Sequence, residues 1–289
     1  MLRRLIALTA LAGIAPAIAQ ADVYSDLILS DNPVAYYRFD DASDSSGNGF
    51  DGTLSGTGGS FADAGYVTPG GISLGDSFTH TTSSFIDLGL AQPGSLLDAL
   101  SGASAVTVEY WLDSATITDG GNVLFLPTAG NAAFVGVGTN NTTGINFGGR
   151  SQSSDGFQNQ SATVPSGLNH IVGIYDYAGG LIDIYVNGAL EVSNAKAFGS
   201  STFNPSFNAN PGSPSGGNTN PRSISIGRGA NGNAGAQAGN TIDELAIYDR
   251  ALTPAEILER STITAIPEPG AFGVLAAIGA GVVTRRRRR

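Results

Sequence analysis

Side chains that carry oxygen ligands are concentrated in one short segment of the sequence. Asp40, Asp41, Asp44, Asn48 and Asp51 all lie within twelve consecutive residues. Carboxylate and amide oxygens are the ligands that Ca²⁺ takes in proteins, so this segment is a candidate cation site. The same residue types also build ordinary Asx turns that hold no ion. The sequence leaves both interpretations open.

A second acidic pair does not have the spacing of a catalytic pair. Glu109 and Asp113 lie four residues apart on one predicted strand, which separates them by roughly 13 Å at ~3.3 Å per residue, too far for a pair that cleaves glycosidic bonds. We therefore interpret Glu109 as a solvent-facing residue. The sequence also lacks a phosphate-binding loop and a His-Glu-x-x-His helix. We expect no catalytic residues, and no enzyme.

Histidine is scarce and cysteine is absent. His80 and His170 are 90 residues apart, so neither has a second histidine at the spacing of a metal site. We expect each to be a polar residue at the edge of a strand. The lack of cysteine excludes a disulfide scaffold, a thiolate zinc site and a cysteine nucleophile.

The charge of the central part of the chain argues against one class of partner. The whole sequence has a formal net charge of −10, but residues 22–262 contain seven of the 14 basic residues and 23 of the 24 acidic ones, which gives this part −16. A chain this acidic is repelled by phosphate backbones, so we expect no nucleic-acid partner. Divalent cations are favoured instead.

Short β-branched segments separated by Gly, Asn, Ser and Pro fill most of the chain. Several alternate polar and apolar residues, the pattern of strands with one buried face. The dipeptide Asn187-Gly188 predicts a type I′ hairpin turn. These features predict an all-β sandwich of two antiparallel sheets, in which each strand has a core side and a solvent side. The clearest predicted strands are residues 104–114, 168–178, 181–186 and 223–229.

Helical signals are few. Thr253 can cap a helix that has Pro254 at its first position and Glu256 to complete a capping box, which predicts one short helix. A second helical turn is expected over residues 25–29. Residues 204–220 are almost entirely polar and are expected to form a long surface loop.

Both ends of the sequence have features of segments that are removed. Basic residues precede an apolar run over residues 5–18, and Ala19 and Ala21 then form a signal-peptidase site, so residues 1–21 are interpreted as a signal peptide of an exported protein.

Residues 263–289 contain Pro267-Glu268-Pro269, an uncharged run of 14 residues and five terminal arginines. As a helix that run reaches only ~21 Å, short of a ~30 Å hydrocarbon core. This leaves residues 22–262 as one domain.

Three segments together resemble the laminin G-like, concanavalin A-like jelly roll. They are residues 27–56 with their Asn-Pro turn and Asp-x-Ser-Gly-Asn-Gly loop, residues 168–190 with their Tyr-Val-Asn-Gly turn, and residues 239–257. The resemblance implies a two-sheet jelly roll in which the first and last strands are neighbours near a structural calcium ion. Carried over residue by residue, it implies calcium ligands at Asp243, Asp44, Asn48 and Asp41.

Jelly rolls of this family often bind glycans, so the resemblance implies a non-catalytic binding module for a polysaccharide or surface glycan. The candidate rings for stacking on sugars are Trp111, Tyr175, Tyr177 and Tyr185, although aromatic residues in strands also serve as core. One alternative is a structural or adhesive surface protein that binds proteins or its own copies. A jelly-roll glycoside hydrolase is a further alternative.

The tail of the sequence resembles the PEP-CTERM sorting signal of Gram-negative bacteria. The resemblance rests on Pro267, Glu268 and Pro269, the short apolar segment and the arginine cluster. It implies transient anchoring in the inner membrane and cleavage at this motif by an exosortase. The expected destination is the cell surface or the extracellular matrix.

Overall fold

The computed structural model describes residues 20–117, 121–127, 133–140, 143–205, 223–227 and 240–264. They belong to one compact unit that spans Gln20–Thr264. Ala19, the sorting motif at residues 267–269 and most of the predicted loop at residues 204–220 lie outside the described residues, whereas Ala21 lies in the first helix. Within the described parts of the chain, no helix is both long and apolar enough to span a membrane.

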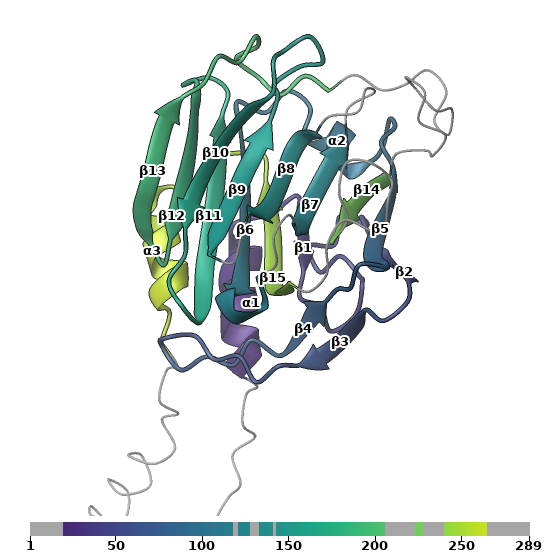
Figure 1. Cartoon of the computed structure of the whole chain (residues 1–289), viewed down its shortest axis with the longest axis vertical. Helices are drawn as coiled ribbons and strands as arrows, with labels where there is room; N and C mark the ends of the chain where they lie inside the picture. The colour runs from purple at the N-terminus through teal and green to yellow at the C-terminus, as the bar shows by residue number, and fades with distance from the viewer. Residues whose placement is uncertain are drawn as a thin grey trace, which may run out of the picture. The chain divides into compact units, whose positions relative to one another are not determined.

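Two antiparallel sheets form a sandwich, which confirms the predicted all-β class (Figure 1). We call the sheet that contains the first and last strands sheet A and the other one sheet B. Sheet A has the order β13 (Ala189–Ala195), β12 (Leu181–Val186), β11 (Leu168–Asp176), β6 (Ala105–Asp113), β15 (Thr241–Tyr248), β4 (Asp76–Thr79) and β3 (Ser60–Asp63), with β1 (Ala35–Tyr37) also paired to β15. Sheet B has the order β10 (Gln158–Thr163), β9 (Gly144–Gly149), β8 (Ala133–Asn140), β7 (Asn122–Pro127), β14 (Ser223–Ile226), β5 (Ser84–Leu90) and β2 (Thr53–Gly56).

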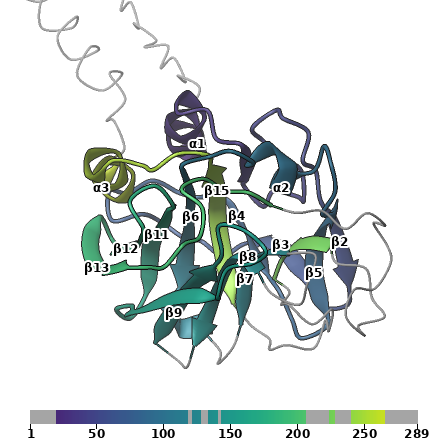
Figure 2. The same cartoon turned by 90° about the horizontal axis from the view of Figure 1, so that it is seen from above.

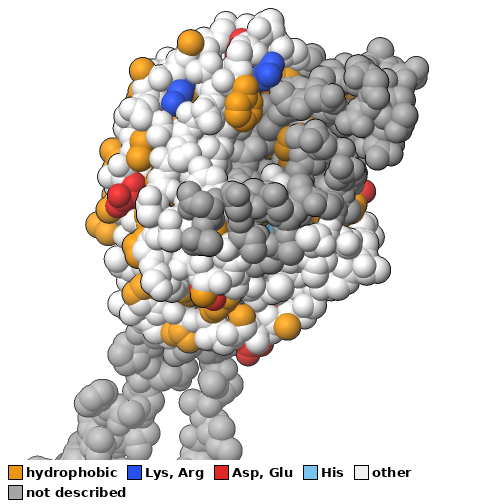
Figure 3. All heavy atoms as spheres, in the orientation of Figure 1, with side chains coloured by type: hydrophobic (Ala, Val, Ile, Leu, Met, Phe, Trp, Pro, Cys, Tyr) orange, Lys and Arg blue, Asp and Glu red, His pale blue; other side chains and the backbone are white. Residues whose placement is uncertain are grey.

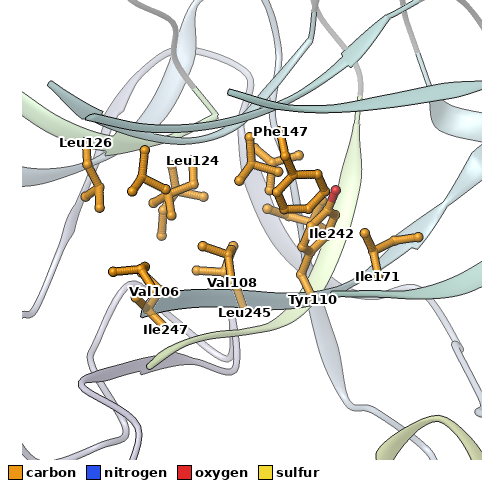
Figure 4. Close-up of a cluster of buried hydrophobic side chains, with 14 of the residues drawn as sticks. Val106, Val108, Tyr110, Leu124, Leu126, Phe147, Ile171, Ile242, Leu245 and Ile247 are labelled. Carbon is orange, nitrogen blue, oxygen red and sulfur yellow. The ribbon is translucent and has the colours of Figure 1, made fainter. Parts of the chain in front are cut away.

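The core lies between the two sheets, where the apolar faces of the alternating strands meet. Val106, Val108 and Tyr110 project from β6 toward Leu124 and Phe147 of sheet B (Figure 4). Tyr110 and Phe147 pack with ring centroids 6.5 Å apart. The period-two pattern of β6 therefore predicts its inward face correctly.

The outward face of sheet A is covered by helices. The helices α1 (Gln20–Ser30) and α3 (Pro254–Thr262) lie against this face, while the four-residue α2 (Leu96–Ala99) packs near the end of the sandwich (Figure 2). As a result, eight of the nine residues of β6 are buried, and the prediction of a solvent side for each strand is wrong for the centre of sheet A. Residues 25–29 belong to the longer helix α1 rather than to an isolated turn.

Local signals place the hairpin and the last helix where the sequence predicts them. Asn187 and Gly188 adopt φ values of 51° and 84° between β12 and β13, as a two-residue turn with positive φ requires. Thr253 accepts a hydrogen bond from the Glu256 backbone N–H, and the Glu256 carboxylate accepts one from the Thr253 N–H, so the capping box of α3 is complete.

Side chains link the two sheets along one edge of the sandwich. The Asn194 amide of β13 donates to Gln160 Oε1 of β10 at 2.7 Å. The Lys196 ammonium donates to the Asn159 carbonyl at 2.7 Å and to Gln160 Oε1 at 3.1 Å. These contacts fix the edge strand of sheet B, β10, against the edge strand of sheet A.

Candidate functional site

A buried polar network fills the space between sheet A and its covering helices. Glu109 of β6 is fully buried, and its Oε1 lies 2.8 Å from His170 Nε2 of β11. The hydroxyls of Tyr24 and Tyr248 each donate to this carboxylate at 3.2 Å. Arg260 of α3 places its Nε 3.4 Å from Glu109 Oε2. One carboxylate therefore holds α1, α3 and three strands together.

The network corrects two sequence expectations. Burial tends to raise the pKa of Glu109, but the hydrogen bond with His170 and the charge of Arg260 outweigh it, and the pKa lies below its ordinary value. Glu109 is thus an internal anion and not a solvent-facing residue. His170 lies in the middle of sheet A instead of at a strand edge, and His80 is buried as well. Alternation alone cannot distinguish a strand face covered by helices from one in water.

A second buried acidic group lies on β15, next to β1. Asp243 and Glu244 are adjacent and fully buried, at a bulge where the register with β6 shifts. Glu244 has φ of 51°, a left-handed conformation that costs energy for a residue with a side chain. The Tyr36 hydroxyl donates to Glu244 Oε2, and the Glu244 N–H donates to Asp243 Oδ1 at 2.9 Å. The remaining oxygens, Asp243 Oδ2 and Glu244 Oε1, are buried without a hydrogen-bond partner.

These two carboxyls resist ionisation in the absence of a positive ion. Burial, and then the charge of Glu244, raises the pKa of Asp243 well above its usual range. Burial also raises the pKa of Glu244 to about 8, against the opposing hydroxyl of Tyr36 and the nearby charge of Arg38. Two hard oxygen atoms without partners fit a divalent cation that takes oxygen ligands. The described residues contain no group of three or more His, Cys, Asp or Glu placed to hold a metal, so backbone carbonyls or water would supply the other ligands.

The loop predicted to share this site uses its side chains to hold its own turns. Asp44 accepts hydrogen bonds from the backbone N–H groups of Tyr36, Ser46 and Phe50 at 2.9–3.1 Å. Asp41 binds the backbone and hydroxyl of Ser43. The bonds to Ser46 and Ser43 are Asx turns, and the other two bonds of Asp44 tie the loop to β1 and to Phe50. Besides Glu244, the charge of Asp40 raises the pKa of Asp243 and the charge of Arg38 lowers it, and both residues come just before this loop.

Asn48 occupies a different position from the two aspartates. Its amide donates to the carbonyls of Pro33 and Val34 at 3.1 and 3.0 Å. It also lines a cleft of about 490 Å³ together with Asn32 and Asp249. The structure thus gives Asp41, Asp44 and Asn48 hydrogen bonds other than to Asp243, and calcium binding by any of the four residues stays a prediction.

The four aromatic residues predicted to stack on sugars do not present their rings to solvent. Trp111 and Tyr175 are 0% exposed, Tyr177 is 3% exposed and Tyr185 is 7% exposed. Trp111 lies under α1, where its ring packs against Tyr24. Tyr175 and Tyr177 belong to the core between the sheets. The prediction of a stacking surface at these residues disagrees with the structure, because strand aromatics here serve packing.

A different aromatic ring lies on the outward face of sheet B. Phe157, in the connection between β9 and β10, is 47% exposed and is the one aromatic side chain among the large exposed apolar residues of the described chain. Its ring covers Gly148 of β9, where a Cβ atom would stand 2.4 Å from the Phe157 Cζ. The glycine therefore creates the seat for the ring. Phe147 points into the core, so Gly148 and the ring face outward.

Polar side chains continue this surface across three strands. Asn146 of β9 donates to Ser161 Oγ of β10 at 2.9 Å, and Asn140 of β8 donates to the same oxygen at 3.3 Å. Asn159 is exposed and pairs directly with Gly148. We call Phe157, Asn140, Asn146, Asn159 and Ser161 the β10 surface. Figure 3 shows the side of the molecule that carries sheet B, where the coloured and white atoms are mostly uncharged.

The sequence contained a signal for this surface, but a weak one. Phe157 stands alone among polar residues in the segment Ser-Asp-Gly-Phe-Gln-Asn-Gln, where no strand core needs a phenyl ring. An isolated aromatic residue in a polar loop is a candidate for an exposed ring. The alternation of the strand does not identify this ring, because Phe157 precedes β10 by one residue.

Comparison with protein families decides the classification. A laminin G domain model, described as the concanavalin A-like lectin/glucanases superfamily, matches residues 90–258, which is more than half of the chain. The chain belongs to this superfamily. The resemblance found in the sequence is therefore confirmed for the domain, and the two-sheet fold of this concanavalin A-like chain agrees with it. No curated protein matches the sequence.

Solved structures share the fold at low sequence identity. Domain 4 of AbnA, an extracellular arabinanase from Geobacillus stearothermophilus solved in complex with arabinotriose, is 20% identical, with a TM-score of 0.51 over 80% of this chain and 98% of that one. The binding domain of botulinum neurotoxin DC, solved with rat synaptotagmin II, is 10% identical, with a TM-score of 0.52 over 80% and 51%. The botulinum neurotoxin serotype G binding domain is 13% identical, with the same TM-score and coverage. The concanavalin A-like chain spans about half of each toxin domain, and the likeness extends to the fold alone.

Proposed function

We propose that this concanavalin A-like chain is a non-catalytic carbohydrate-binding protein, and that its ligand is a polysaccharide or surface glycan that lies across the β10 surface. The observation that carries the proposal is the half-exposed ring of Phe157 seated on Gly148. The ring contacts the sheet at Gly148, and its exposed part can cover the apolar face of a sugar ring. Because the ring is already held in place, little side-chain entropy is lost when the ligand binds.

The amides beside the ring supply the polar half of such a site. Asn146 and Asn140 direct their amide groups to the shared Ser161 hydroxyl, and Asn159 is exposed beside them. Amides and hydroxyls both donate and accept hydrogen bonds, as sugar hydroxyls require. The description of the arabinanase domain with arabinotriose is consistent with an oligosaccharide ligand on this fold.

The internal position of Glu109 supports the proposal of a protein without catalysis. Its carboxylate is fully buried and takes hydrogen bonds from Tyr24, Tyr248 and His170, so a polysaccharide has no access to it. The neighbouring acid Asp113 accepts hydrogen bonds from the Tyr66 hydroxyl and the Ala115 N–H. A pair that cleaves glycosidic bonds needs access to substrate and to water.

The proposal includes a structural cation and an extracellular destination. Asp243 and Glu244 would hold Ca²⁺ with the two oxygens that lack hydrogen-bond partners, and the ion would neutralise two buried negative charges. The signal peptide, residues 1–21, would direct export, and the Pro267-Glu268-Pro269 motif would direct processing by an exosortase. The mature protein would then bind glycans at the cell surface or in the extracellular matrix.

The test is retention on polysaccharide by a variant that removes only the ring. We expect Phe157→Ala to lose binding to bacterial and plant polysaccharides in affinity electrophoresis while it keeps the melting temperature of the parent. Leu54→Ala is the matched control, because Leu54 is also an exposed apolar residue of sheet B but lies on β2 at the opposite edge. Equal retention of both variants would rule out this surface as the binding site.

A second candidate function, self-association, is favoured by one edge of sheet A. The edge strand β13 is largely exposed, and Leu190 on it and Leu258 on α3 are each 51% exposed. Exposed edge strands are common sites of association. A molecular mass above the monomer value in light scattering, lost in Leu190→Lys, would support this alternative.

A further inference from the structure

Basic side chains are distributed unequally over this acidic protein. Three of the five described Arg and Lys residues, Arg38, Arg250 and Arg260, lie within 4.0 Å of carboxylates around sheet A and its helices. The other two are Arg150 and Lys196. Neither forms an ion pair with any carboxylate in the described parts of the chain, and both lie beside β10. Two uncompensated positive charges thus border the β10 surface.

Lys196 approaches the surface from the edge of the sandwich. Its ammonium donates to the Asn159 carbonyl at 2.7 Å, and Asn159 is the strand partner of Gly148, on which the Phe157 ring rests. The ammonium therefore lies at the strand next to the one that carries Gly148, and adjacent strands are about 4.8 Å apart. The contacts of Lys196 with Asn159 and Gln160 use neutral oxygens, which leave its charge uncompensated.

Arg150 approaches from the end of β9. It follows Gly149, and its Nη1 donates to the Asp155 carbonyl at 2.7 Å. The Asp155 carboxylate forms no ion pair with the guanidinium and accepts hydrogen bonds from the Ser151 backbone and hydroxyl and from the Gln152 N–H. The connection that carries Phe157 is thus bound to Arg150 through the Asp155 backbone, and the Arg150 Nε has no hydrogen-bond partner.

We propose that the β10 surface selects an anionic glycan, in which Phe157 covers a sugar ring while Arg150 and Lys196 bind carboxylates of uronic acid units. This inference rests on the proposed carbohydrate-binding function and names its ligand class. Guanidinium and ammonium groups form charge-assisted hydrogen bonds with carboxylates, and these are stronger than bonds between neutral groups. A neutral glycan would leave both charges without a partner.

The overall negative charge of the domain does not prevent this binding. At an ionic strength of 0.15 M the Debye length is about 8 Å, so the distant carboxylates around sheet A are screened from a ligand on sheet B. Contacts within hydrogen-bond distance are screened much less. The negative net charge of the domain weakens non-specific binding of polyanions. Binding of an anionic glycan therefore depends on the local positive charges of Arg150 and Lys196.

The experiment compares polygalacturonate with its methyl ester, which has the same sugar ring but no charge. Binding is measured by calorimetry without added calcium, because calcium cross-links uronate polymers. We expect the parent protein to bind polygalacturonate about tenfold more tightly than the ester. Arg150→Gln/Lys196→Gln should lose this preference and keep its affinity for the ester. The control Thr82→Asp/Gln92→Glu makes the same change in net charge at exposed residues on the opposite side of sheet B and should keep the preference.

The outcomes separate this inference from the function on which it rests. Equal affinity of the parent for the two polymers, with both lost in Phe157→Ala, would overturn the anionic ligand and leave carbohydrate binding in place. An unchanged affinity of Phe157→Ala for both polymers would overturn the binding surface itself. Lys196→Gln alone is measured in parallel, because Lys196 makes no contact with the Asp155 turn. If the double variant has a lower melting temperature than the parent, the single variant decides. An unchanged preference of Lys196→Gln for polygalacturonate over the ester would contradict the role of Lys196.

Discussion

Glu109 Oε1 and His170 Nε2 lie 2.8 Å apart in the centre of sheet A, with both side chains fully shielded from water. The two residues come from adjacent strands, but their contact is enclosed by Tyr24 of α1 and Arg260 of α3. A buried carboxylate without its partners would cost several kcal/mol. The packing of α1 and α3 on sheet A therefore depends on the Glu109 carboxylate, and the buried carboxylate depends on the partners that these helices supply.

Removing the Glu109 carboxylate should destabilise the protein, because it is the shared partner of the buried network. We expect Glu109→Ala to lower the free energy of unfolding by about 3–5 kcal/mol, because His170 would remain buried without its hydrogen-bond partner and Arg260 would keep only Asp31 as a charge partner. Urea denaturation followed by circular dichroism measures this loss. Glu191→Ala, an exposed glutamate on β13, is the control and should change stability by no more than about 0.5 kcal/mol. Similar midpoints for the two variants would contradict a structural role for Glu109.

The strands could be predicted from the sequence, but the environment of their outward faces could not. The alternation of Val106, Val108 and Tyr110 indicates a strand with one apolar face, and the structure confirms it. Whether Glu109 then meets water or a helix depends on α1 and α3, which lie far away in the sequence. Period-two patterns describe one strand and contain no information about what covers it.

The candidate sites were predictable to different degrees. Asp243 could be selected from the sequence resemblance, and the structure places it in a buried acidic pair. Its neighbour Glu244 cannot be predicted as part of this pair from the sequence. The orientation of Glu244 results from a bulge and a positive φ, and no local sequence pattern indicates either. Phe157 cannot be identified from strand patterns, because it lies outside β10 and the aromatic residues within strands here mostly belong to the core. Turn chemistry at Asn187 and capping at Thr253 were predictable because each depends only on adjacent residues.

The raised pKa of Glu244 predicts a stability that declines with rising pH. Its folded pKa of about 8 exceeds the ordinary value of 4.5, so the folded state binds a proton more tightly than the unfolded state. The stability this proton contributes is complete below about pH 4.5 and is lost as pH rises through 8. In a chelator, Glu244→Gln should therefore be more stable than the parent at pH 8.5, with a smaller advantage at pH 5. Parallel stability curves for parent and variant across this range would contradict the prediction.

Calcium should replace that proton at neutral and alkaline pH. At a calcium concentration 100 times the dissociation constant, an ion bound only to the folded state adds about 2.7 kcal/mol, which raises the melting temperature of a domain of this size by roughly 5–10 °C. We expect this increase for the parent and none for Asp243→Asn, measured by scanning calorimetry before and after chelator. Asp63→Asn is the matched control, because Asp63 is exposed on β3, is not a candidate ligand and accepts a hydrogen bond from the Gly65 N–H of its own turn. If the chelator leaves the melting temperature of the parent unchanged, the prediction of a bound calcium ion is wrong.

The seat of Phe157 can be tested without changing the ring itself. In Gly148→Ala the new Cβ would stand 2.4 Å from Phe157 Cζ and 2.9 Å from Cε1, so the ring must move. Because the displaced group is the end of a half-exposed side chain, we expect a melting temperature close to that of the parent and an affinity for polysaccharide reduced about as far as in Phe157→Ala. Full affinity in Gly148→Ala would show that the seated position of the ring is not needed.

The two ends of α3 allow a separate test of the predicted sorting tail. A chain that ends at Thr264 retains Arg260 and its contacts with Glu109 and Asp31, and it lacks only the residues interpreted as a cleavable signal. We expect it to unfold at the same denaturant concentration as the chain of 289 residues, but to be missing from the cell surface. A chain that ends at Thr253 also loses α3, and it should be destabilised at least as much as Glu109→Ala, because the buried carboxylate loses Arg260. Normal surface delivery of the chain ending at Thr264 would refute the sorting role of the Pro267-Glu268-Pro269 motif, whereas its failure to fold would assign the tail to the structure.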